Sequence, residues 1–211
     1  MLLDNSPLVA EATASATSRD WRPSQQAKAW ALASGGALYS ISHMLNLLGS
    51  TPGLNSVHEV LGKYLFGIGA LLIMAGLGSL MSQFARSPLG VLGTQLTWFG
   101  MLYMPLSTYT ILFIFPLVGW EGLGAIDELA VIPTVLTIPT VVIGPVILAI
   151  AAWRHKAMAW WNACIFFLSA AALGLMMAVP AWEPPLAIGS TIVVGLGYLA
   201  AGLRARRVVN R

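Results

Sequence analysis

The sequence predicts an all-α integral membrane protein, a polytopic bundle of six transmembrane helices, and composition is the first reason. Hydrophobic residues make up 57% of the 211 residues and charged residues only 9%, whereas about a quarter of the residues in a soluble domain are charged. A chain with so few charges cannot cover a soluble core with polar surface. The composition therefore excludes a soluble enzyme, a disordered chain and a disulfide scaffold.

Six long apolar stretches are the second reason. Each holds roughly 18 or more residues without a charge, which at about 1.5 Å per residue is enough to cross a hydrocarbon core about 30 Å thick. Strands of a membrane barrel would alternate apolar and polar residues, and these stretches do not. The predicted spans cover approximately residues 29–50, 57–82, 88–118, 128–153, 157–180 and 185–203, within a transmembrane domain of residues 27–204.

The basic residues predict the orientation of the bundle. With a cytoplasmic N-terminus, ten of the eleven Lys and Arg residues lie inside and only Lys63 lies outside, which is the positive-inside pattern. An even span count then makes both termini cytoplasmic, with a polar tail over residues 1–26 and a basic tail over residues 205–211. The expected location is the cell membrane, with a bacterial cytoplasmic membrane as the best fit. Because the basic residues flank apolar spans, they do not indicate a nucleic-acid partner.

Prolines and glycines predict how the spans bend and pack. Each proline in a helix removes a hydrogen bond and pushes on the preceding turn, so Pro105 predicts a kink in the third span. The fourth span is expected to be broken or kinked by Pro133, Pro139 and Pro145. Small residues let helix backbones approach closely in lipid. Such a face is predicted in the second span by Gly62, Gly69 and Gly76, and it would serve packing inside the chain or contact with other membrane subunits.

One polar cavity is expected in the outer half of the bundle. Three-residue steps place Ser40, His43 and Asn46 on one face of the first span, and side chains at matching depth in the third and fourth spans would complete the lining. The predicted lining is Tyr39, Ser40, His43, Asn46, Tyr103, Ser107, Thr108, Thr134 and Thr137. The predicted rim is His58, Glu59, Asp127 and Glu128.

Two histidines give this cavity a second interpretation, as a metal-binding site. His43 and His58, with a carboxylate as third ligand, would suit a divalent metal, and either histidine could reach a haem iron. The alternative is that His43 is an interhelical residue that only makes hydrogen bonds. Glu59 also has a structural explanation, because Ser56 and Glu59 have the spacing of a helix capping box.

Three functions remain open. The first is a non-catalytic membrane subunit or a binder of an apolar ligand such as a lipid, a quinone or a pigment. The second is a membrane-embedded enzyme that acts on a lipid-like substrate through the outer histidines and carboxylates. The third is a small-solute transporter. No Asp, Glu, Lys or Arg lies near the middle of any span, which favours the first, because pumps and ion-coupled carriers place ionisable groups there.

Overall fold

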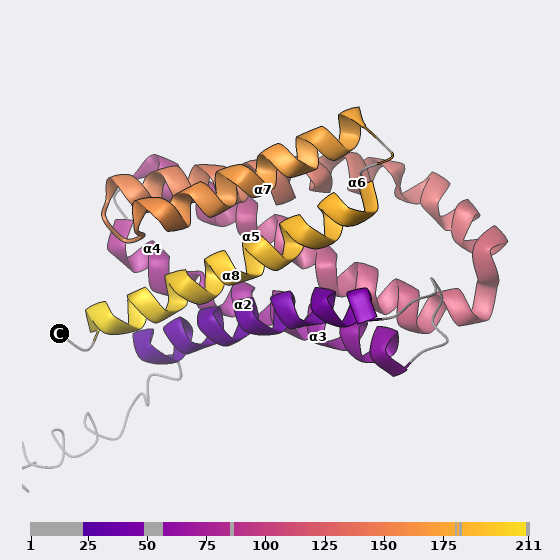
Figure 1. Ribbon diagram of the computed structural model, residues 1–211, viewed down its shortest axis with the longest axis horizontal. Coiled ribbons are helices and arrows are strands. Elements are labelled where there is room, and N and C mark those ends of the chain that lie inside the picture. Colours follow the sequence, from indigo (N-terminus) through magenta and orange to yellow (C-terminus); the bar gives the residue numbers. More distant parts are fainter. Residues whose placement is uncertain (1–22, 49–56, 85–86, 180, 182, 210–211) are drawn as a thin grey trace, which may run out of the picture.

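The computed structural model describes residues 23–48, 57–84, 87–179, 181 and 183–209, with the side chains of 46–48, 120, 123–139, 176–177 and 183–184 left out of the description. Within these ranges the chain is helical almost throughout and contains no strand (Figure 1). The predicted all-α class is therefore confirmed. Residues 1–22 of the predicted N-terminal tail and residues 210–211 of the predicted C-terminal tail lie outside the described residues, whereas residues 205–209 continue the last helix.

The helices run up and down along one common direction (Figure 1). If α3 is joined with α4, and α5 with the π-helix η1, six helical rods follow one another, which agrees with the predicted number of helices. In chain order the elements are α2 (Gln25–Leu48), α3 (Val57–Gly76), α4 (Gly78–Phe84), α5 (Pro88–Tyr109), η1 (Thr110–Ile114), α6 (Phe115–Arg154), α7 (Trp160–Ala178) and α8 (Glu183–Val209).

Three helices are long and apolar enough to cross a membrane, and they cover Val57–Phe84, Pro88–Gly119 and Pro185–Val209. Two shorter apolar helices, Thr140–Arg154 and Trp160–Leu175, follow the same direction. The first of these segments begins, and the second ends, at a limit of the described side chains. The helix α2 is less apolar because Lys28, His43 and several serines and glutamines lie along it. These helices support a membrane protein by length and composition.

Adjacent glycines let α2 fit tightly between two neighbours. A Cβ on Gly35 would lie 2.7 Å from the Ile73 backbone nitrogen in α3. A Cβ on Gly36 would meet the Leu199 backbone in α8. Because successive residues of a helix point about 100° apart, one Gly-Gly pair serves both contacts. The expected close approach at Gly69 and Gly76 is confirmed, since a Cβ on either would meet the backbone of α2.

A second close pair is formed by α5 and α6. Gly93 and Gly100 of α5 lie against the backbone of α6, and Gly144 of α6 lies against the backbone of α5 at Thr97. Thr97 satisfies its buried hydroxyl inside its own helix, where Oγ1 donates to the Gly93 carbonyl at 2.7 Å. The two helices therefore meet through small residues, as helices do when hydrophobicity alone cannot hold them together in lipid.

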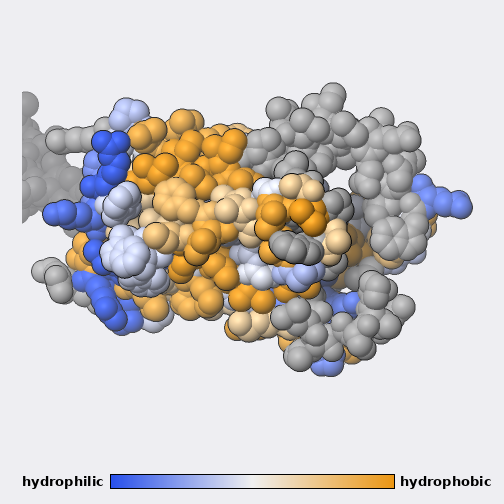
Figure 2. Space-filling view, turned by 45° about the horizontal axis from the view of Figure 1, so that its top comes forward, coloured by the Kyte–Doolittle hydropathy of each residue, from blue (hydrophilic) through white to orange (hydrophobic). Residues whose placement is uncertain are grey.

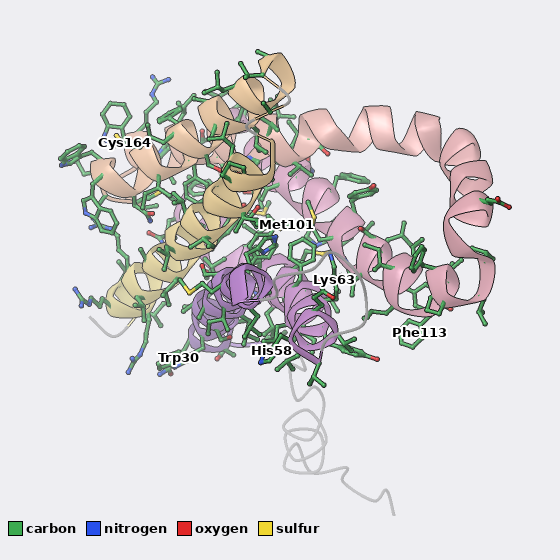
Figure 3. The ribbon with its side chains drawn as sticks, turned by 45° about the vertical axis from the view of Figure 1, so that its right-hand side comes forward. Trp30, His58, Lys63, Met101, Phe113 and Cys164 are labelled. Carbon is green, nitrogen blue, oxygen red and sulfur yellow. The ribbon has the colours of Figure 1, made fainter. Side chains whose placement is uncertain are left out.

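The irregular backbone of the bundle lies away from the predicted prolines. Five residues after Pro105 the helix widens into η1, where the Phe115 amide donates to the Thr110 carbonyl. At Gly119 the backbone of α6 takes φ 65° and ψ −169°, a conformation open to glycine. Beyond this point α6 arches away from the other helices before it returns (Figures 1 and 3). Pro145 is buried within α6, and the backbone is helical through Pro133, Pro139 and Pro145, so the predicted breaks are not confirmed.

Charge separates the two ends of the molecule. Figure 2 shows an apolar band in the middle and hydrophilic residues gathered at one end. Contacts between elements define that end, because Arg204 bonds to the Lys156 carbonyl and Arg206 stacks on Trp30. The basic end, as we call it, carries Lys28, Arg154, Lys156, Arg204, Arg206 and Arg207. The opposite end carries Glu59 and Lys63 at the start of α3.

Candidate functional site

The predicted polar cluster is centred on His43, where α2 faces α3. Tyr39 and His43 lie one turn apart on α2, with ring centroids separated by 5.7 Å. Phe66 of α3 touches both, at 4.8 Å from the Tyr39 ring and 5.0 Å from the imidazole, which it meets edge to face. Lys63 lies one turn before Phe66 on α3. These four residues, Tyr39, His43, Phe66 and Lys63, are called the His43 cluster.

Hydrogen bonds hold the imidazole in one orientation. Nδ1 lies 3.0 Å from Ser42 Oγ and 3.3 Å from the Tyr39 carbonyl oxygen. Ser42 Oγ in turn donates to the Tyr39 carbonyl at 2.7 Å. Both described hydrogen bonds of the imidazole are at Nδ1. The carbonyl can only accept, and the Ser42 hydroxyl hydrogen is already donated to it, so Nδ1 carries the proton in these contacts. Nε2 is then the nitrogen that can accept a hydrogen bond from a ligand.

Lys63 brings a positive charge to the His43 cluster. Its side chain is half-buried and points into the middle of the bundle, whereas His58 lies at the periphery (Figure 3). Glu59 precedes Lys63 by one helical turn, a spacing at which opposite charges attract. A charged side chain inside an apolar helix is costly to keep and usually marks a functional position.

Two other predicted lining residues belong to different contacts. Ser40 is buried on the part of the predicted face of α2 that turns toward α8, where Oγ donates to the Ile192 carbonyl at 2.9 Å. Thr108 is buried against Gly67 of α3, whose Cβ position lies 3.2–3.3 Å from the threonine side chain. Tyr103 and Ser107 of α5 are half-buried. The predicted single lining is therefore divided between several helix contacts in the described structure.

The remaining predicted site residues are placed as follows. His58 is exposed at the start of α3 and Glu59 is half-buried beside it. Among the described residues, no three His, Cys, Asp or Glu side chains come close enough to hold a metal ion. The side chains of Asn46, Asp127, Glu128, Thr134 and Thr137 lie outside the described residues, so the metal and haem hypotheses for His43 and His58 stay predictions.

Three residues of the bundle interior were not among the predicted site residues. Phe66 was not considered, and Lys63 was treated only as a topological charge. Lys63 and Phe66 lie four and seven residues after Glu59, and this helical spacing would have placed them on one face with it. Tyr198 of α8 is fully buried, packs edge to face on Phe166 at 5.0 Å, and has no hydrogen-bond partner for its hydroxyl in the described part of the chain.

The chemistry of the His43 cluster is that of recognition. It offers a nitrogen of His43, the ammonium group of Lys63 and two aromatic rings, in surroundings that are otherwise apolar. Such a set can hold an acceptor group, a carbonyl or a carboxylate, attached to an apolar body. Comparison of the chain with models of protein families, with curated proteins and with solved structures finds no match in any of the three. The chemistry of the cluster is therefore the basis for assigning a function.

Proposed function

We propose that the chain is a six-span protein of the cell membrane, with both termini in the cytoplasm, that binds an apolar ligand without changing it chemically. The three membrane-length helices and the apolar middle of the molecule support a membrane location. The gathering of cations at the basic end supports a cytoplasmic position for that end. In this arrangement α2, α5 and α7 run outward, and α3 with α4, α6 and α8 run inward.

The observation that carries the binding function is the contact of the His43 imidazole with the Phe66 ring, with Lys63 one helical turn before Phe66 on α3. Both polar groups are half-buried, although each loses hydration inside an apolar bundle. A lipid-like molecule with an acceptor headgroup, such as a quinone or a fatty acid, would accept a hydrogen bond from Lys63, and the hydroxyl of a protonated fatty acid would also donate to Nε2 of His43. Its apolar body would lie along the aromatic rings of Phe66 and Tyr39. The ligand would enter from the outer half, as the depth of His43 in α2 indicates.

The test is the content of bound small molecules in the purified protein. Wild-type protein, His43→Leu and Lys63→Met are purified in one neutral detergent, and organic extracts are quantified by mass spectrometry per mole of protein. We expect the wild type to retain an apolar molecule and each variant to retain at most about a tenth of that amount. A tenfold loss is the effect of removing one buried hydrogen bond to a charged or strongly polar group. His58→Gln is the matched control, because His58 is exposed, and it should retain the wild-type amount.

Two outcomes contradict the proposal. Retention of the same molecule in His43→Leu and Lys63→Met would show that the His43 cluster does not bind it. Wild-type protein that carries no extractable molecule and gains no thermal stability from added ubiquinone-1 or oleic acid would show that there is no such site. Turnover of a bound lipid would favour the membrane enzyme, and solute uptake by reconstituted vesicles would favour the transporter.

A further inference from the structure

A basic cavity lies at the opposite end of the molecule from the His43 cluster. It has a volume of about 550 Å³ and forms where α6 turns into α7, with α8 alongside. The residues that line it are Trp153, Arg154, Lys156, Met158, Ala159, Trp160 and Arg204. Three of these are cations and none is an acid. This set of residues is called the basic cavity.

The three cations of the basic cavity come from α6, from the turn that follows it and from α8. Arg154 ends α6, Lys156 lies in the turn, and Arg204 comes from α8, forty-eight residues later. Arg204 Nη2 donates to the Lys156 carbonyl at 3.2 Å, which ties α8 to the turn. Lys156 itself has a positive φ of 57°, a conformation that side chains adopt only where the surroundings hold them. Like charges held together without an acid among the lining residues create a site for an anion.

The surroundings of the basic cavity indicate where that anion comes from. Trp153 and Trp160 are 53% and 67% exposed, and tryptophans of this kind sit at headgroup depth, with the ring in the apolar layer and the N–H in the polar one. Met158 adds an apolar wall. A second cavity of about 430 Å³ shares Arg154 and reaches the start of α5. Basic recesses between membrane helices on the cytoplasmic side suit the headgroups of anionic lipids.

We propose that the basic cavity binds the headgroup phosphate of an anionic phospholipid, with Arg154, Lys156 and Arg204 around the phosphate and the acyl chains beside Trp153 and Trp160. This site is independent of the His43 cluster and of the ligand proposed for it. It holds a resident lipid at the cytoplasmic face, where three helices meet.

Native mass spectrometry of the full chain in neutral detergent tests the proposal. The protein is titrated with dioleoylphosphatidylglycerol and, separately, with dioleoylphosphatidylcholine. Each basic residue near an anionic lipid contributes about a fivefold preference. The double variant Lys156→Gln/Arg204→Gln should therefore bind phosphatidylglycerol about 30-fold more weakly, with a smaller loss for phosphatidylcholine, whose choline cation offsets its phosphate charge. Lys28→Gln/Arg207→Gln removes the same charge from the same end outside the cavity, and should change neither lipid by more than about twofold.

A single substitution serves as a control for loss of folding in the double variant. Lys156→Gln keeps the backbone carbonyl that receives Arg204, and should weaken phosphatidylglycerol binding about fivefold by itself. Equal losses in the cavity variant and the Lys28→Gln/Arg207→Gln control would reduce the effect to net charge and overturn the proposal. Equal binding of the two lipids by wild type would overturn it as well. Glycerol 3-phosphate that competes at concentrations comparable with the lipid would assign the cavity to a soluble phosphate instead.

Discussion

The close contact of α2 with its neighbours makes Gly35→Ala the most informative single substitution. The added Cβ would lie 2.7 Å from the Ile73 nitrogen and 2.8 Å from the Gly69 carbonyl oxygen. Ordinary van der Waals contact begins at 3.4 Å, so the nearest atom is 0.7 Å too close. Both atoms belong to the backbone of α3 and cannot turn aside. Movement of α2 away from α3 would press Gly36 into α8, so neither direction relieves the contact.

The expected loss of stability follows from these distances. Overpacking a core that cannot relax costs about 1–3 kcal/mol, and we expect the upper part of this range because α2 is blocked on both sides. Alanine recovers up to about 1 kcal/mol through its higher helix propensity. The net loss should be about 2 kcal/mol, or roughly 30-fold in the folding equilibrium constant. Unfolding of the purified protein in mixed micelles, titrated with dodecyl sulfate, measures it.

Gly189→Ala is the matched control for this measurement. Gly189 lies in α8 and no atom comes within 4 Å of its Cβ position, so the same chemical change meets open space. We expect Gly189→Ala to leave the unfolding free energy unchanged or to raise it slightly. Equal effects of the two substitutions would refute the contact of α2 with α3 as the structure places it.

Three further substitutions test other contacts in the same unfolding assay. Ser40→Ala removes the 2.9 Å hydrogen bond to α8 and should cost about 0.5–1.5 kcal/mol; no loss would mean that this bond contributes nothing. Gly119→Ala places a side chain at φ 65° and should cost about 1–3 kcal/mol, and an unchanged midpoint would show that the bend is absent. Arg206→Gln removes the cation 4.3 Å from the Trp30 ring centroid and should cost about 0.5–1 kcal/mol. Arg207→Gln should cost less, and a larger loss in Arg207→Gln than in Arg206→Gln would contradict the stacking.

Composition and spacing predicted the helices and the glycine contacts well, for physical reasons. A charge-poor chain has few ways to satisfy its backbone other than as helices in lipid. A seven-residue glycine spacing keeps one face of a helix small wherever its partner lies. Gly69 and Gly76 therefore meet α2 as the spacing indicates. The periodicity of a helix depends on the sequence of that helix alone, so it can be predicted without knowing which helices become neighbours.

The arrangement of the candidate site was less predictable, because it depends on which helices become neighbours. Ser40 and His43 share a broad face of α2, but two helices divide that face, so Ser40 bonds to α8 while His43 meets Phe66 of α3. The bend at Gly119 was also unforeseen, since sequence does not show which glycine takes a positive φ. Lys63 was counted only as a charge outside the membrane, although its spacing from Glu59 and Phe66 places it on the face with them.

The central claim, a membrane-spanning chain with both termini in the cytoplasm, is tested most directly by labelling with a membrane-impermeant maleimide. Cys164 is the single cysteine, so Cys164→Ser provides a background for Asn55→Cys in the first predicted outer loop and Asn210→Cys in the C-terminal tail. In intact cells we expect labelling of Asn55→Cys alone, with Asn210→Cys labelled only after the cells are opened. Labelling of Asn210→Cys in intact cells, or a chain that stays in solution when membranes are sedimented without detergent, would contradict the account.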